Sequence, residues 1–480
     1  MRFQNRADQM EKHKKRMHHF CANTLVLLLS AGLLSGCQGD SGGQEPEPER
    51  TAVTYEEQME LWKDEAEGTE VSCWYTNEAD RDWLEQCARE FNEQYGMTVS
   101  PVYYDGVSLF EDMNTVAQKD AAPDVYLAGN DQLELAVLSG MACPNTSVND
   151  GFWKESYPET AVNAVTYQGK RYGYPVYFDT YCLVYDANLL KQAPASMDEI
   201  LAFLDEYEDT GSTKAIFRWD VADPYINTMF YAAYVDLFGE NGDQADSFQV
   251  NNAQSVAAME YFQSLSDYLW MNKKNISHDT VRNRIKDGTL VLGLCKSDIL
   301  PTLYEMQAAG GTEGEAQKAD AEQKEEDSET DPDTGEGTGD GQTSEITSED
   351  ETDYRISYVP SLTKELSSQT LSTTCEALVN PYGHCVSGGQ MFALYLSYAC
   401  ADGQFAGNGK LPVRAGETKL DEMQSVIYAQ YNNSRPVPKV MALGDYMAES
   451  GIVFDAIWSG HDVKEQLAKL QSVMEAKLKK

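Results

Sequence analysis

The stretch that decides the class of fold is residues 71–104, VSCWYTNEADRDWLEQCAREFNEQYGMTVSPVYY. Its first five residues are rich in β-forming side chains and predict a strand over 71–75. Apolar side chains then recur at helical spacing between Trp83 and Tyr95, which predicts a helix that ends at Gly96. Residues 97–104 alternate and are rich in Val and Tyr, which predicts a second strand. This order of strand, helix and strand is typical of a parallel sheet with helices on its faces.

Outside this stretch the chain continues to alternate between strand and helix patterns. Ser196 and Glu199 form a capping box at the start of a predicted helix over 196–207, which Gly211 ends. The pattern as a whole predicts an α/β fold. The other predicted elements are strands over 124–128 and 290–294, a β-rich stretch over 172–185 that Pro175 interrupts, helices over 253–269, 390–401 and 463–480, and structured chain from residue 354.

The first 36 residues have the pattern of a bacterial export signal. A basic stretch ends at Arg16. The apolar run that follows is shorter than the roughly 20 residues that a membrane-spanning helix needs, and it fits the apolar region of a signal peptide. The sequence LSGC at 34–37 resembles the lipobox of bacterial lipoproteins, in which the cysteine is acylated and becomes the first residue of the mature protein. We expect a signal peptide over 1–36, a lipid on Cys37 and a flexible tether over 37–55. An uncleaved anchor helix is the alternative, and either arrangement holds the body outside the cytoplasmic membrane.

The charge of the chain is strongly negative. Its 78 acidic and 37 basic residues give a formal net charge of −41, which opposes binding to nucleic acids or anionic membrane surfaces through bulk charge. Residues 310–353 consist almost entirely of acidic, small and polar residues, with Ile346 as their single aliphatic side chain. Because such a composition cannot form a core, we expect a disordered acidic insertion over 310–353. We expect no nucleic-acid partner, and contact with the membrane only through the lipid.

The sequence lacks the common motifs for catalysis, metals and cofactors. Eight cysteines follow Cys37 without a Cys-x-x-Cys pair, and three histidines follow it, at positions 278, 384 and 461. We favour buried thiols, with a disulfide framework as the alternative. Acidic pairs such as Asp131 with Glu134 could serve a glycosidase, but 78 carboxylates produce such pairs by chance. We therefore expect no enzyme activity, no cofactor and no metal.

Several short motifs occur in a distinctive order. They are APDVY at 122–126 with Asp131 and SGM at 139–141, YQGKRYGYPV at 167–176, LVYDANLL at 183–190, SMDEI at 196–200, RPVP at 435–438 and IWSG at 457–460. In order and spacing these motifs resemble the maltose/maltodextrin-binding family, which are extracellular solute-binding proteins of ABC importers. The resemblance extends from about residue 71 to residue 480, apart from the acidic insertion.

The resemblance implies a two-lobed, periplasmic-binding-protein-like fold of type II. Each lobe is an α/β sandwich, and the lobes close on a ligand around a hinge of several segments. The implied boundaries are 56–178 and 375–433 for lobe one, 179–374 and 434–480 for lobe two, and 178–181, 374–377 and 434–438 for the hinge.

The resemblance also implies a ligand site between the lobes. Glu78, Asp131 and Asp179 align with family carboxylates that accept hydrogen bonds from sugar hydroxyls or lie in the cleft. Asp223 and Tyr225 align with an acidic and an aromatic residue that line the cleft.

The residues at the expected stacking positions of this site differ from those of the maltose binder. Two positions that carry stacking tryptophans in that protein are Ala128 and Met447 here, and a third falls near Asp298. These departures argue against maltodextrin itself as the ligand. The tyrosines that we expect to supply stacking area instead are Tyr75, Tyr126, Tyr177, Tyr181 and Tyr446.

Together these features predict a monomeric, lipid-anchored substrate-binding component of an ABC importer on the outer face of a bacterial cell membrane. It would capture a carbohydrate and deliver it to the permease subunits. We expect this carbohydrate to be an oligosaccharide. Two alternatives stay open. One is a surface glycoside hydrolase with a carboxylate pair, and the other is a sensor lipoprotein that presents its ligand to a membrane kinase.

Overall fold

The structure is a computed structural model of the chain. It describes residues 54–117, 122–145, 148–207, 214–271, 273–309, 352–400, 409–414 and 419–479. The predicted signal peptide, Cys37, the tether up to residue 53, Gly211 and the acidic insertion up to residue 351 lie outside these ranges.

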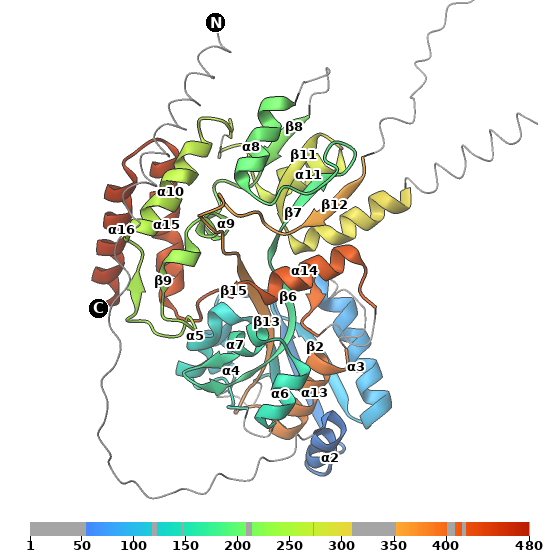
Figure 1. Cartoon of the computed structure of the whole chain (residues 1–480). Coiled ribbons are helices and arrows are strands. Elements are labelled where there is room, and N and C mark those ends of the chain that lie inside the picture. The colour runs from blue at the N-terminus through green and yellow to red at the C-terminus, as the bar shows by residue number, and fades with distance from the viewer. Residues whose placement is uncertain are drawn as a thin grey trace, which may run out of the picture. The chain divides into compact units, whose positions relative to one another are not determined.

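Seven strands form the first sheet, in the order β14-β6-β13-β3-β1-β2, with β15 paired to β13. Four of them, β2, β6, β13 and β15, are labelled in Figure 1. The strands β2, β1 and β3 are parallel, as predicted from their connecting helices. The wider prediction of a parallel sheet is wrong, because β13 runs antiparallel to both β3 and β6. The strand bounds are β1 Glu70–Tyr75, β2 Thr98–Tyr103, β3 Val125–Gly129, β6 Gly173–Asp179, β13 Leu371–Val379, β14 Leu411–Pro412 and β15 Arg435–Pro436.

Helices cover both faces of the first sheet. One apolar cluster joins α2 (Tyr55–Ala66), α3 (Arg81–Tyr95) and α13 (Val386–Tyr398) to the sheet, and a second joins α4 (Leu109–Ala117) and α5 (Leu133–Leu138) to it. Helix α3 ends as predicted, with Gly96 in the left-handed region. Helix α13 begins four residues before its predicted start because the thiol of Cys385 caps it, which is an unusual capping residue. The smaller elements are α6 (Asp150–Ser156), α7 (Glu159–Ala164), β4 (Thr166–Tyr167) and β5 (Lys170–Arg171).

Four strands form the second sheet, in the order β12-β7-β11-β8. The β-rich stretch over 172–185 supplies β6 of the first sheet and β7 of the second, and the break between them falls at Thr180 instead of Pro175. Pro175 stays inside β6, where the pairing register with β13 shifts, so the missing N–H coincides with an irregularity of the ladder. The bounds are β7 Tyr181–Asp186, β8 Ala215–Arg218, β11 Leu290–Lys296 and β12 Tyr354–Ser357.

Helices also cover the second sheet. Ser196 caps α8 as predicted, but the carboxylate of Glu199 accepts the N–H of Ala195. Helix α10 ends at Leu265, four residues before the predicted end, where the hydroxyl of Ser266 bonds the carbonyl of Gln263. The bounds are α8 Met197–Glu206, α9 Pro224–Thr228, α10 Ala253–Leu265, α11 His278–Lys286, α15 Ala442–Trp458 and α16 Val463–Leu478, with the short pair β9 Asp236–Leu237 and β10 Phe248–Gln249.

The chain passes between the two sheets near one place. Thr180 joins β6 to β7, residues 358–370 lead from β12 to β13, and β15 pairs with the first residues of β13. Helix α14 (Glu422–Asn432) packs next to the strands of the second sheet and shares an apolar cluster with the first. The exact lobe boundaries given above stay a prediction.

Two further findings concern the cysteines and the helices of the described part. The eight cysteines of the described part are free, and five of them are buried. None of the helices in the described ranges combines the length and the apolar character that a membrane span requires.

Candidate functional site

The ends of the strands bring the predicted ligand residues to the region between the sheets. In an open α/β sheet, ligands bind beyond the carboxyl ends of parallel strands. Glu78, Asp131 and Asp179 lie at the carboxyl ends of β1, β3 and β6. In the second sheet, β8 leads to Asp223, while Tyr181 begins the antiparallel strand β7 at the same edge.

A cavity of about 100 Å³ lies where the two sheets meet. Three of the predicted site residues, Asp179, Tyr181 and Tyr225, line it. The crossing segments supply most of its other walls. The remaining lining residues are Thr180, Lys296, Leu371, Ser372, Thr373 and Val437.

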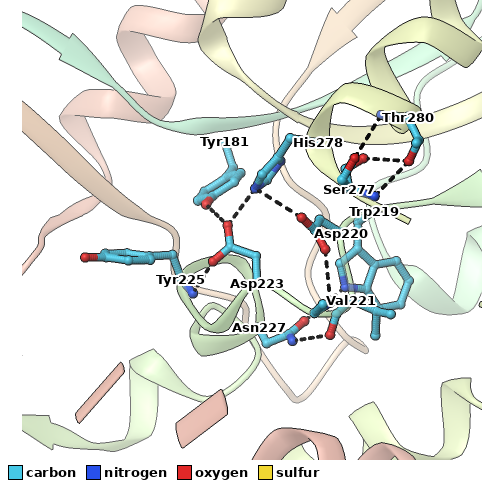
Figure 2. A network of polar contacts seen from close by, with 11 residues as sticks. Tyr181, Trp219, Asp220, Val221, Asp223, Tyr225, Asn227, Ser277, His278 and Thr280 are labelled. Carbon is cyan, nitrogen blue, oxygen red and sulfur yellow. Dashed lines mark hydrogen bonds and ion pairs between the residues drawn. The ribbon is translucent and has the colours of Figure 1, made fainter. Parts of the chain in front are cut away.

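Asp223 is the centre of a polar network beside this cavity, shown in Figure 2. Its Oδ1 accepts the backbone N–H of Tyr225 (2.8 Å) and so caps α9. Its Oδ2 lies 2.6 Å from Nε2 of His278 and accepts the hydroxyl of Tyr181 (3.1 Å). Asp220 lies on the other side of His278, with 3.9 Å between Oδ2 and Nε2. Both oxygens of Asp223 are thus engaged with the protein, so this carboxylate positions its neighbours.

The electrostatics of the two carboxyls in this network differ. Burial alone would raise the pKa of Asp223, but the bonds from His278 and the Tyr225 N–H, with the charge of Lys296, hold that pKa below its usual value. Burial raises the pKa of Asp220 because its favourable contacts are weaker. Asp223 is therefore the anionic anchor of the pair.

Tyr225 and Asp131 face the same region from opposite sheets. Burial raises the pKa of Tyr225 to about 12, and the nearby charges of Asp131 and Asp223 add to that effect. Burial also raises the pKa of Asp131. The hydroxyl of Tyr225 makes no hydrogen bond with another described residue, so it can serve a ligand.

A second polar group links Asp179 to Tyr177. Asp179 accepts the hydroxyl of Ser297 (2.8 Å) and forms an ion pair with Lys410 at 3.5 Å. The Lys410 ammonium lies 6.0 Å from the centre of the Tyr177 ring. The Tyr177 hydroxyl in turn donates to Asp80, whose pKa burial raises to about 6. Lys410 therefore holds together two residues that the sequence placed in the site.

Glu78 and Tyr75 lie further along the edge of the first sheet. Glu78 is exposed and binds the guanidinium of Arg81 (2.6 Å from Nη2 to Oε1). That guanidinium lies over the ring of Tyr103, and Tyr103 contacts the buried Tyr75 with 5.6 Å between ring centroids. The contacts described above do not join these residues to the cavity.

Two of the predicted stacking tyrosines belong to the apolar cores. Tyr126 is completely buried and donates its hydroxyl to the carbonyl of Met141. Tyr446 is completely buried and shares hydrogen bonds with Thr228 and Tyr231. In this arrangement neither tyrosine offers a ring face to a ligand.

The side chains at the three positions that lack tryptophan are engaged with other parts of the protein. Ala128 and Met447 are buried, and Asp298 forms an ion pair with Arg282. No aromatic platform replaces the tryptophans at these three positions.

Four residues of the site were not identified from the sequence: His278, Lys296, Ser297 and Lys410. Each comes from a segment without a recognisable motif. The pairing of β7 with β11 and of β14 with β6 brings Lys296, Ser297 and Lys410 to the site, and helix α11, which packs against β11, brings His278. Across the described ranges, no three His, Cys, Asp or Glu side chains are arranged to hold a metal ion.

A comparison with known protein families finds a match for this chain. Residues 86–321 match the model of the family described as bacterial extracellular solute-binding protein. The match covers 236 of the 480 residues, so nearly half of the chain is similar to this family. The family is one of binding proteins, and its members act outside the cell.

Two relatives match parts of the chain. The maltodextrin-binding protein MdxE of Bacillus subtilis is 24% identical over 233 residues, which cover 46% of this chain and 54% of the relative. The maltooligosaccharide ABC transporter solute-binding lipoprotein of Streptococcus pneumoniae is 24% identical over 203 residues, with 40% and 45% covered. The chain thus spans about half the length of these relatives.

Solved structures confirm the predicted two-lobed α/β fold. A cyclo/maltodextrin-binding protein complexed with maltotetraose superposes with a TM-score of 0.67 at 16% identity, covering 85% of this chain and 97% of the other. The extracellular solute-binding protein of Staphylococcus aureus in complex with maltose superposes with a TM-score of 0.66 at 15% identity, covering 85% and 98%.

Proposed function

We propose that this chain is the substrate-binding component of an ABC importer for an oligosaccharide. A lipid on Cys37 would hold it at the outer face of the cell membrane. The observation that carries the proposal is the cavity at the meeting point of two sheets, lined by groups from both, in a fold shared with sugar-binding proteins. A ligand there contacts both lobes and favours the arrangement in which they close.

The chemistry of the site suits hydroxyl-rich ligands. Hydroxyls and an ammonium at the cavity can donate hydrogen bonds, and hydroxyls can also accept them. Tyr225 adds a ring that can pack against the C–H face of a sugar. We propose Tyr225, Tyr181, Asp179 and Asp131 as ligand contacts, with Asp223 as the residue that positions the two tyrosines.

The relatives bind maltodextrin or maltooligosaccharides by name. Maltooligosaccharides are therefore the first ligands to test, although the buried Ala128 and Met447 remove stacking area that a glucan binder would use. A chain that binds them would have to hold the sugar rings mainly through tyrosines.

Titration calorimetry on the purified mature chain tests the proposal. We expect binding of at least one neutral oligosaccharide from a panel of α- and β-glucans, galactans and mannans, and at least a tenfold loss of affinity in Tyr225→Ala. Tyr358→Ala, at an exposed tyrosine, is the matched control and should bind as the wild type does. A chain that binds no saccharide on the panel contradicts the proposal.

The same material separates the two alternatives. A hydrolase would release shorter sugars during a long incubation, which chromatography detects, and a binding protein would leave the oligosaccharide intact. A sensor would bind the sugar equally well, but deletion of its gene would abolish a transcriptional response and leave uptake of labelled sugar unchanged. We expect the deletion to abolish uptake.

A further inference from the structure

The cavity between the sheets is lined by a cation that makes no close hydrogen bond or ion pair with another described residue. Lys296 ends β11, faces Tyr181 of β7 across the ladder and lines the cavity. Within the described residues, its ammonium group makes no hydrogen bond and no ion pair within 4.0 Å. Lys296 is half-buried, and its ammonium carries three donors and no acceptor, so it can donate to a ligand in the cavity.

The carboxylates around the cavity already have donors. Asp179 binds Ser297 and Lys410. Asp223 binds His278, Tyr181 and the N–H of Tyr225. Asp298, two residues beyond Lys296, binds Arg282. These acidic groups therefore already have cationic or hydroxyl partners in the protein, and Lys296 is the charged donor that can serve a ligand.

The other free groups at the cavity also complement an acceptor. The hydroxyls of Tyr225 and Thr373 line it and make no hydrogen bond with any other described residue. With Lys296 they form a set of donors from both sides of the cavity: Lys296 and Tyr225 from the second sheet and the helix next to it, and Thr373 from β13 of the first sheet. A group with several acceptor lone pairs satisfies all three, whereas a single sugar hydroxyl has only two.

The cavity leaves room for such a group. It has a volume of about 100 Å³ and is partly open. A carboxylate, with three heavy atoms, fits into it, and the rest of a sugar can extend through its open side.

We propose that Lys296 binds the carboxylate of an acidic sugar, so that the ligand is an oligosaccharide containing a uronate. This inference rests on the proposed function and specifies the ligand class of the same site. An ammonium–carboxylate hydrogen bond is about twice as strong as a neutral one, so this contact selects an acidic sugar over a neutral sugar of the same shape. The selection acts locally in a chain whose net charge of −41 otherwise repels anions.

Calorimetry with paired sugars tests the inference. Each pair sets a di- or trisaccharide of glucuronate or galacturonate against its neutral glucose or galactose counterpart. We expect the wild type to bind the uronate form of one pair at least tenfold more tightly, as a hydrogen bond to a charged group gives about ten- to hundredfold. Lys296→Met should reduce that preference to about onefold, and Lys296→Arg should retain most of it.

Control variants separate the outcomes. Lys364→Met, at an exposed lysine, should keep the full preference, and circular dichroism should show that Lys296→Met is folded. Neutral sugars bound as tightly as their uronate forms would overturn the inference and leave the proposed function standing. A uronate preference that survives in Lys296→Met would overturn the role of Lys296. A wild type that binds neither form would contradict the proposed function as well.

Discussion

Glu376 is a carboxylic acid at the middle of β13 that the fold buries completely. Neither of its oxygens has a hydrogen-bond partner among the described residues. Burial raises its pKa well above the usual value, and the nearby charge of Asp131 adds to this, while Lys439 opposes it. The same environment lowers the pKa of Lys439 to about 8. The folded state therefore favours the protonated form of Glu376 more strongly than the unfolded chain does.

This protonation predicts a pH dependence of stability. Above about pH 4.3 the unfolded chain releases the Glu376 proton while the folded state keeps it, so folding loses up to about 1.4 kcal/mol per pH unit from this residue. Glu376→Gln removes the effect. We expect its free energy of urea unfolding, relative to the wild type, to rise from pH 5 to pH 8. Glu93→Gln, at an exposed carboxylate, should show no such trend, and equal trends in the two variants would contradict the prediction.

Gly173 is required by its contact with the same glutamate. A Cβ at this position would lie 2.1 Å from Oε2 and 2.9 Å from Cβ of Glu376, which is enclosed and cannot move aside. We expect Gly173→Ala to lower the free energy of urea unfolding by about 1–3 kcal/mol. Gly444→Ala is the matched control, because it lies in helix α15 with open space around it and should gain up to about 1 kcal/mol. Loss of stability in both variants would show that the contact is not the cause.

Among the elements, the short strand β15 is held in place by one arginine. It is the last of the three places where the chain passes between the sheets. Its first residue, Arg435, is half-buried and donates to three backbone carbonyls, those of Val235, Leu237 and Gly239. Burial lowers the pKa of Arg435, which nevertheless stays a cation at physiological pH. One side chain thus ties β15, which pairs with β13, to the loop around β9.

Arg435→Leu is expected to lower the free energy of unfolding by about 3 kcal/mol, because it leaves several buried carbonyls without donors. Arg435→Lys keeps the charge but cannot reach all three carbonyls, and a loss of about 1–2 kcal/mol is expected. Urea denaturation measures both. Arg89→Leu provides the comparison, since Arg89 is exposed and makes only a 3.9 Å pair with Glu85, which predicts a change below about 1 kcal/mol. A conservative lysine variant as unstable as the leucine variant would show that charge has no part in this contact.

At the scale of the whole molecule, a ligand that contacts groups from both sheets links them. It binds the folded protein and not the unfolded chain, so a free concentration of one hundred times Kd adds about 2.7 kcal/mol to the free energy of unfolding. We expect this increase in chemical denaturation with the sugar that binds best. A sugar from the panel that gives no calorimetric signal should leave the curve unchanged, and equal stabilisation by both sugars would indicate a solvent effect.

The elements that the sequence alone predicted well are those with local signals. The strand and helix over 71–95, the left-handed end at Gly96 and the Ser196 cap all follow from side-chain periodicity and capping chemistry, which act within a few residues. The direction of β13 could not be read in this way, because it depends on where the chain returns from after the second sheet. The start of α13 was missed because a thiol caps it.

For the site, the resemblance of the sequence to a family of binding proteins picked out candidate acidic and aromatic residues, including Asp131, Asp179, Asp223 and Tyr225. Only the tertiary structure decided which of them are free. It engages both oxygens of Asp223 and encloses Tyr126 and Tyr446 in the cores. It also brings Lys296 to the cavity without a close hydrogen bond or ion pair to another described residue. The physical reason is that hydrogen-bond satisfaction depends on all neighbours in space, and those neighbours include segments distant in the sequence, such as Ser297, which lies 118 residues from Asp179.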